Sequence, residues 1–281
     1  MNYDTSVLMQ PQGEPIHLDH AKLHCGITDT DRDLLIPAWI ADARGRIEGM
    51  TNRQLLHARF ELSLPCFPEE SCRVEGEWRY RGIVLPHAPL VGVVSVQYVD
   101  EAGATQTVDP AAYVVNARKV PAVIVPTYGY SWPATLQTPE AVTVTYDAGY
   151  ASPLTADATA DTITVTGPVT FAVGDAVRFQ NSGGALPAPL LARRDYYVRT
   201  SPGNGVYTLS TTSGGSLLDL TDAGSGLSLI GEVPASILAW MLLQVEQLAR
   251  NRGATEVIER GQVSTMPFVD GLVERFRVYL P

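Results

Sequence analysis

The sequence predicts an α+β protein with a helical core, a small antiparallel sheet and an inserted all-β domain. Three observations lead to this fold class. The stretch from Pro234 to Gly253 has helix signals at both ends, residues 59–146 alternate between apolar and polar as β-strands do, and the composition changes at Ala151. The predicted core combines N-terminal helices with the long helix from Pro234.

The stretch from Pro234 to Gly253 carries most of this prediction. Pro234 suits a first helical turn, where its missing N–H needs no partner, and Gly253 can form a left-handed cap. Apolar residues fall on one broad face of this helix: Ile237, Leu238, Met241, Leu242, Val245, Leu248 and Ala249. Trp240 and Leu243 lie outside that face, so the helix either sits between two layers of one subunit or meets a neighbouring subunit. We favour contact with a neighbouring subunit.

Two helices are predicted near the N-terminus, after a polar segment that ends at about Pro15. The first is short, with Asp19 as its N-cap and Gly26 as its C-cap. The second has apolar residues at helical spacing, namely Ile36, Ile40, Ala43 and Ile47. Pro37 leaves two alternatives, a kinked helix or a helix that begins at Pro37 with a separate turn before it.

Strands are predicted from Arg59 onward, where β-branched and aromatic residues alternate with polar ones. They cover residues 60–64, 82–85, 93–99, 113–115, 122–125 and 142–146. Residues 100–103 form a predicted hairpin turn. The helix from Pro234 is expected to cover one face of this small sheet.

The segment 151–231 is predicted to be an inserted domain. It is rich in Thr, Ser, Gly, Asp and Ala, and it contains short strand patterns separated by glycine-rich loops. Such a pattern fits either a small β-barrel or a β-sandwich. Residues 1–150 and 232–281 then form the domain that receives the insert.

Composition excludes several classes of protein. The formal net charge of −10 argues against wrapping nucleic acid, which needs a basic face, and no apolar run is long enough to cross a membrane. Cys25, Cys66 and Cys72 have no repeat spacing, so we expect reduced thiols rather than a disulfide framework.

No catalytic constellation emerges from the sequence. His20 and His24 are four residues apart and could face a metal together, but no second pair of ligands follows at a typical spacing. Asp147 precedes Gly149 at a strand end and is interpreted as a turn former. We therefore predict no enzyme activity, no catalytic residue, no metal and no cofactor.

Four segments follow one another in a recognisable order: LDHAKLHCGITDTDRDLLIPAWIADARGRIE, VTVTYDAGY, VPASILAWMLLQVEQLARNR and MPFVDGLVERFRVYLP. Together they resemble the gp6-like and phiE125 gp8-like head-tail connector (adaptor) proteins of tailed bacteriophages. The insert is similar to small β modules of phage tail and fibre proteins. The resemblance thus covers both flanks of the insert.

This resemblance implies a structural virion protein that is made in the host cytoplasm and located in the neck. A dodecameric ring would sit below the portal protein, extend the DNA channel without specific DNA binding, and dock the tail or a stopper (tail-completion) protein. Arg277, Val278, Tyr279 and Leu280 would form the portal-docking segment. The alternative is a virion binding module whose inserted β domain recognises a carbohydrate or another virion protein.

Overall fold

The computed structural model describes residues 4–11, 13–68, 82–166, 170–182, 184–192, 194–231, 233–250 and 267–280. The chain divides into two compact units. We call one the sandwich unit, made of Met1–Pro11, His57–Gly149 and Val278–Pro281. The other, called the mixed unit, consists of Gln12–Leu56 and Tyr150–Arg277.

The predicted helical core is wrong, because the protein is mostly β. Strands make up 35% of the structure and helices 20%. Its buried apolar residues form three clusters, of which one lies among the helices and two are built largely from strand residues. The strands predicted between residues 60 and 146 are present as β-strands, but strands and not helices form most of the core.

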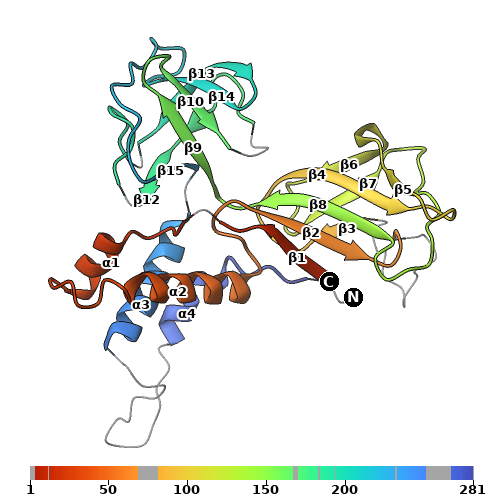
Figure 1. The fold of residues 1–281 in the computed structure, drawn as a ribbon, viewed down its shortest axis with the longest axis horizontal. Coiled ribbons are helices and arrows are strands. Elements are labelled where there is room, and N and C mark those ends of the chain that lie inside the picture. Colours follow the sequence, from red (N-terminus) through yellow and green to blue (C-terminus); the bar gives the residue numbers. More distant parts are fainter. Residues whose placement is uncertain are drawn as a thin grey trace, which may run out of the picture. The chain divides into compact units, whose positions relative to one another are not determined.

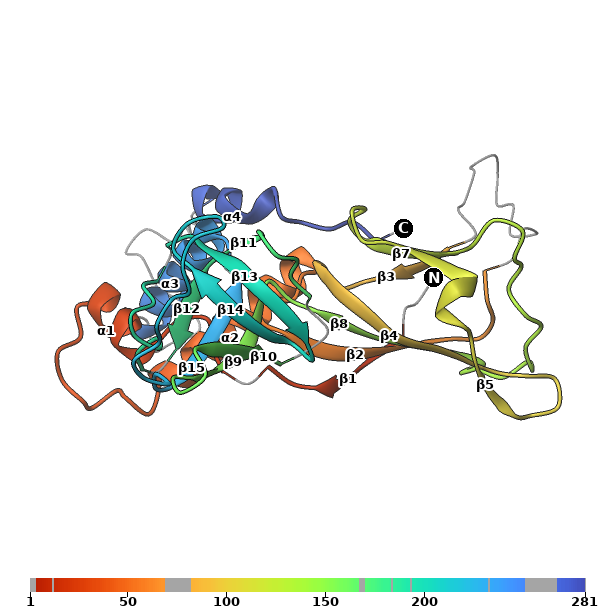
Figure 2. The ribbon, with the colours of Figure 1, turned by 90° about the horizontal axis from the view of Figure 1, so that it is seen from above.

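The sandwich unit contains two antiparallel sheets that face each other (Figures 1 and 2). The five-stranded sheet has the order β1 (Asp4–Met9), β2 (Ala58–Leu64), β8 (Val142–Ala148), β4 (Leu90–Val99) and β5 (Thr105–Thr107). The three-stranded sheet has the order β3 (Ile83–Leu85), β7 (Ala122–Pro126) and β6 (Tyr113–Asn116), and the 3-10 turn Pro110–Ala112 precedes β6.

Alternation explains why these strands form a sandwich. Phe60 and Leu62 point into the core from β2, while the intervening residues stay partly exposed. Asp100 accepts backbone N–H bonds from Ala102 and Ala104 and closes the predicted hairpin between β4 and β5. No strand was predicted in the polar N-terminal segment, yet residues 4–9 pair with β2 as an edge strand.

Four helices lie in the described part of the mixed unit: α1 (Leu18–Cys25), α2 (Ile36–Thr51), α3 (Ala235–Arg250) and α4 (Pro267–Glu274). α3 contacts each of the other three helices. Pro37 occupies the first turn of α2, so the second sequence-based alternative is correct. None of these helices has the length and apolarity that crossing a membrane requires. The predicted cap residue Gly253 lies outside the described residues.

The buried face of α3 belongs to the helical cluster and not to the cluster between the two sheets. The expectation that this helix covers a face of the small sheet is therefore wrong. The sandwich unit does not depend on α3 for burial, because its second sheet supplies the apolar layer that the first sheet needs.

Residues 151–231 form a seven-stranded antiparallel sheet around an apolar cluster of their own. Its order is β11 (Ala176–Val177), β13 (Tyr196–Gly203), β14 (Val206–Ser210), β10 (Thr162–Val165), β9 (Ala151–Asp157), β15 (Leu227–Gly231) and β12 (Phe179–Ser182). The two edge strands, β11 and β12, are separated in sequence by Arg178 alone. Such a short connection between opposite edges curls the sheet toward a closed barrel. Its status as an insert with these domain boundaries stays a prediction.

Candidate functional site

Arg53 fixes the base of the C-terminal segment. Asn52 ends α2 in the left-handed conformation, with φ of 51°, and the chain turns so that Arg53 follows directly. The Arg53 Nε donates a hydrogen bond to the Phe276 carbonyl oxygen at 2.5 Å, and its Nη1 donates to the Tyr150 hydroxyl at 2.8 Å. The guanidinium carbon also lies 5.8 Å from the centres of both aromatic rings.

A second arginine, directly after α4, contacts the Phe276 ring. The guanidinium carbon of Arg275 lies 4.7 Å from the centre of the Phe276 ring, and its Nη2 donates to Ser236 Oγ at 2.8 Å. Burial raises the pKa of Tyr150 although Arg53 opposes the shift, so this phenol stays neutral at physiological pH. Two arginines thus anchor the end of α4 to the mixed unit, where Phe276 packs against the helical cluster.

The predicted portal-docking residues have different environments. Val278 is buried, with 3% of its surface exposed, whereas Tyr279 is 72% exposed. Leu280 is half-buried, and Arg277 lies 3.6 Å from the Glu274 carboxylate. Val278 therefore packs within its own subunit, whereas Tyr279 is the exposed aromatic residue of this segment. Portal docking itself stays a prediction.

The two predicted interface residues on α3 also differ. Trp240 is 2% exposed and belongs to the helical cluster, whereas Leu243 is partly buried against that cluster. Because α3 is contacted by three helices, Trp240 is buried within the subunit although it lies outside the main apolar face. The subunit-interface role of Trp240 and Leu243 stays a prediction, and Leu243 is the more accessible of the two.

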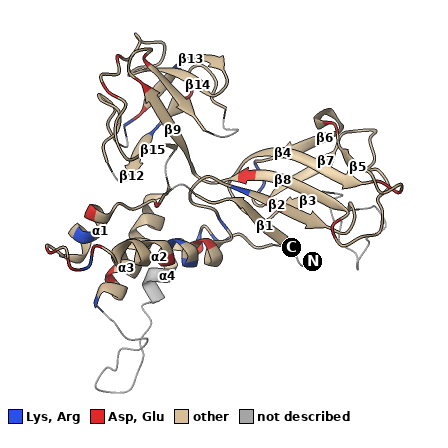
Figure 3. Ribbon diagram, viewed as in Figure 1, with Lys and Arg blue, Asp and Glu red and all other residues tan. Residues whose placement is uncertain are grey.

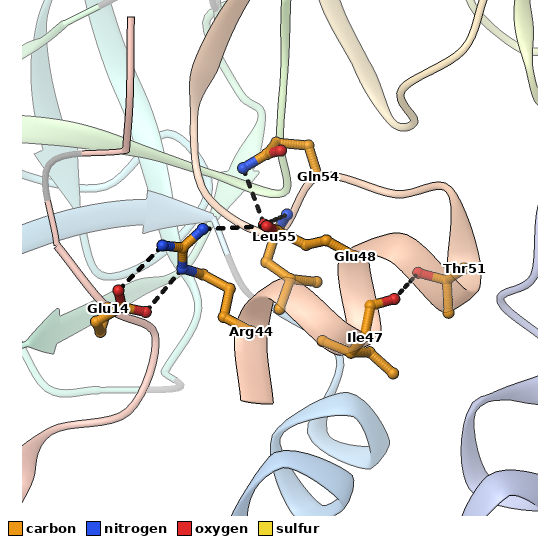
Figure 4. Close-up of polar contacts among 7 residues, drawn as sticks. All are labelled: Glu14, Arg44, Ile47, Glu48, Thr51, Gln54 and Leu55. Carbon is orange, nitrogen blue, oxygen red and sulfur yellow. Dashed lines mark hydrogen bonds and ion pairs between the residues drawn. The ribbon is translucent and has the colours of Figure 1, made fainter. Parts of the chain in front are cut away.

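A polar network ties the N-terminal segment to the end of α2 (Figure 4). Arg44 donates to both oxygens of Glu14, at 2.8 and 3.1 Å, and to Glu48 at 3.0 Å. The second oxygen of Glu48 accepts hydrogen bonds from the Leu55 N–H and the Gln54 amide. Burial raises the pKa of Glu48 even though these donors act in the opposite direction. The network fixes the turn that precedes β2.

Asp147 is a buried ion-pair residue and not the turn former that the sequence suggested. It lies in β8 directly opposite Arg59 of β2, whose Nε and Nη2 donate to the two carboxylate oxygens at 3.0 Å each. The His57 Nε2 lies 3.4 Å from the same carboxylate. Burial alone raises the pKa of Asp147, but the neighbouring His57 and the hydrogen bonds from Arg59 outweigh it and lower the pKa. Sequence reasoning predicted both strands but not their pairing, and it is the pairing that places Arg59 opposite Asp147.

The candidate metal ligands near α1 are not brought together. Within the described ranges, no group of three or more His, Cys, Asp and Glu side chains has metal-binding geometry. His24 instead lies 3.4 Å from Glu246 of α3. Figure 3 shows Lys and Arg next to Asp and Glu along the helices, in keeping with ion pairs such as Lys22 with Asp33. Cys72 lies outside the described residues.

Comparison with known families agrees with the sequence-based resemblance. The model of the family described as phage gp6-like head-tail connector protein matches residues 15–74. The predicted resemblance to gp6-like head-tail connectors is confirmed. The matched segment contains α1, α2 and all residues of the polar network except Glu14. No curated protein sequence matches the chain.

Solved structures with a similar fold extend the likeness to the whole chain. One is a chain from the neck of an empty gene transfer agent (GTA) particle with C6 symmetry, at a TM-score of 0.55 and 15% identity, over 99% of this chain and 97% of that one. Another, from the neck of a native GTA particle with C12 symmetry, has a TM-score of 0.51 and 15% identity, over 100% and 97% of the two chains. A chain from the virion of the native GTA particle has a TM-score of 0.54 and 15% identity, over 99% of this chain and 96% of that one. The shared fold therefore includes residues 151–231.

Proposed function

We propose that this protein is a structural connector subunit in the neck of a tailed, phage-like particle. The observation that carries the proposal is the fold: chains that match it over nearly their full length come from particle necks. The gp6-like family match at residues 15–74 supports the same function from sequence. The C6 and C12 symmetry of those necks supports a ring of subunits, which we propose to be dodecameric.

The buried charges of the protein fit a structural role. A buried carboxylate can act as a catalytic acid or base, but the buried carboxylates named above accept hydrogen bonds from arginines of the same chain. Arg59 donates to Asp147, and Arg44 donates to Glu48. The first pair joins β2 to β8, which are distant in sequence, and the second lies within α2. The proposed connector therefore acts through contacts with its neighbours and has no catalytic step.

The C-terminal segment is the proposed portal contact. Arg53 and Arg275 fix the chain up to Phe276 within the mixed unit, and the burial of Val278 fixes the residue that precedes Tyr279 within the sandwich unit. A large exposed aromatic residue with a fixed base loses little conformational entropy on binding, as residues that dominate binding energy do. The tail or a stopper protein would dock on another surface of the ring.

Deletion of the gene tests this function in the strain that produces the particles. Without the connector, the strain should make DNA-packaging heads that carry portals but do not join tails, and expression of the intact chain should restore joining. Tailed particles of normal appearance and yield in the deletion strain would contradict the proposal. Particle counts by negative-stain electron microscopy, with the complemented strain as the control, distinguish these outcomes.

A further inference from the structure

The hairpin of β6 and β7 differs in charge from the rest of the protein. Residues 110–139 contain no Asp or Glu, whereas the whole chain has 30 of them in 281 residues. The two charged residues in that stretch, Arg118 and Lys119, are adjacent at the hairpin tip. β6 and β7 themselves carry no charge (Figure 3). An acidic protein therefore presents one purely cationic turn.

The structure exposes this tip and holds its base. Residues 116–120 are all exposed. About half of the surface of Val120, the last of them, and of Val114 in β6 is exposed, at 49% and 51%. Ala122 and Ile124 of β7, by contrast, are buried between the two sheets, so the hairpin cannot swing freely. The two cationic side chains are thus carried on a turn whose position in the sandwich unit is fixed.

Arg118 differs from several other arginines of the protein. Arg44, Arg59, Arg178 and Arg250 each form an ion pair with a carboxylate of the same chain. Arg118 makes no hydrogen bond or ion pair with any residue that the structure describes. The nearest acidic residues along the sequence, Asp109 and Glu140, lie outside the hairpin. The charge of Arg118 is therefore not neutralised within the subunit by a described partner.

We propose that the β6–β7 tip contacts the phosphate backbone of double-stranded DNA passing through the neck. The inference rests on the proposed connector function and goes beyond it by assigning the residues that meet the DNA. Arg118 and Lys119 supply sequence-independent phosphate contacts, and the absence of acidic residues from 110–139 removes local repulsion. In a ring, every subunit repeats the pair, so weak individual contacts act together while the DNA slides.

Photo-crosslinking in particles tests the assignment. Ala117, exposed beside Arg118, is replaced by p-benzoyl-L-phenylalanine in the full-length protein. The matched control carries the same residue at Tyr128, which is fully exposed just beyond β7, at the end of the strand opposite the tip. After irradiation of DNA-filled particles, we expect covalent DNA adducts from position 117 and none from position 128. Adding Arg118→Gln and Lys119→Gln to the Ala117 variant should remove the adducts.

The outcomes separate this inference from the proposed function. If the variants are present in purified particles but position 117 gives no DNA adduct, or gives as much as position 128, the phosphate contact is wrong while the connector function stands. Crosslinks from position 117 to a protein alone would also overturn it and point to an acidic partner surface. Absence of the intact, unmodified chain from purified particles would overturn both.

Discussion

His87 makes the stability of the sandwich unit sensitive to mild acid. Its ring stacks on Phe60 with 3.8 Å between ring centres and an angle of 11° between the planes. Its Nδ1 lies 2.7 Å from the Tyr146 hydroxyl. Burial lowers the pKa of His87 to about 4. The perturbation that we propose is His87→Gln, which keeps a hydrogen-bonding group near Tyr146 and removes the titration.

The magnitude follows from the difference between the folded and unfolded pKa values. The folded state holds His87 neutral, while the unfolded chain takes up a proton below its ordinary pKa of about 6.5. The contribution of neutral His87 to the free energy of unfolding is therefore complete above about pH 6.5 and is lost as the pH falls toward 4. Between pH 7.5 and pH 5 the loss from this one group is about 2 kcal/mol, at about 1.4 kcal/mol per pKa unit.

Hydrogen exchange measured by mass spectrometry can read this loss in peptides from β2, β4 and β8, after correction for intrinsic exchange rates. His87→Gln should be less stable than the wild type at pH 7.5, because stacking is lost, but its further loss on going to pH 5 should be about 2 kcal/mol smaller. His20→Gln, at an exposed position, serves as the control and should follow the wild type. Equal losses on acidification in the wild type and in His87→Gln would refute the reasoning.

Three further predictions concern the surfaces of the proposed connector. Arg53→Met removes two hydrogen bonds donated by a charged group and should destabilise the end of α4 by on the order of 2 kcal/mol. Hydrogen exchange should become faster at residues 272–277 but not in β2. Unchanged exchange at residues 272–277 would show that Arg53 is not the anchor. Tyr279→Ser should leave the melting temperature nearly constant but abolish co-sedimentation with portal-bearing particles, and retained co-sedimentation would place the portal contact elsewhere. Trp240→Ala should lower the free energy of unfolding of the monomer by about 3–5 kcal/mol. Leu243→Gln should lower it less but weaken ring assembly, measured by analytical ultracentrifugation. Normal assembly of Leu243→Gln would show that Leu243 is not in the interface.

The sequence was most informative where a local signal settles a local structure. Pro234 marked the approach to α3, Gly26 forms the predicted left-handed cap of α1 with φ of 66°, and Asp100 closes the predicted hairpin. Such signals depend on the few residues around them, since caps and turns are satisfied by near neighbours in the chain. The order of the connector-like segments along the chain also indicated the resemblance to gp6-like connectors, which is confirmed.

Features that depend on distant parts of the chain were missed. Residues 4–9 have no strand pattern, because an edge strand needs only one partner and buries little, and it is β2 that fixes them. Trp240 was assigned to a second, outward face of α3, because the periodicity of one helix does not say how many neighbours surround it. Asp147 resembled a turn residue until pairing of β2 with β8 placed Arg59 opposite it. The site residues at the C-terminus came from the resemblance, and the anchoring role of Arg53 had no sequence signal.

The central claim is that copies of this chain form a ring in the particle neck. Cryo-electron microscopy of purified particles, with local symmetry applied at the neck, tests it most directly. The account predicts a twelvefold ring of density between portal and tail into which the sandwich unit and the mixed unit each fit, and loss of that ring together with tail joining in the deletion strain. A complete neck in particles that lack this chain would contradict the account.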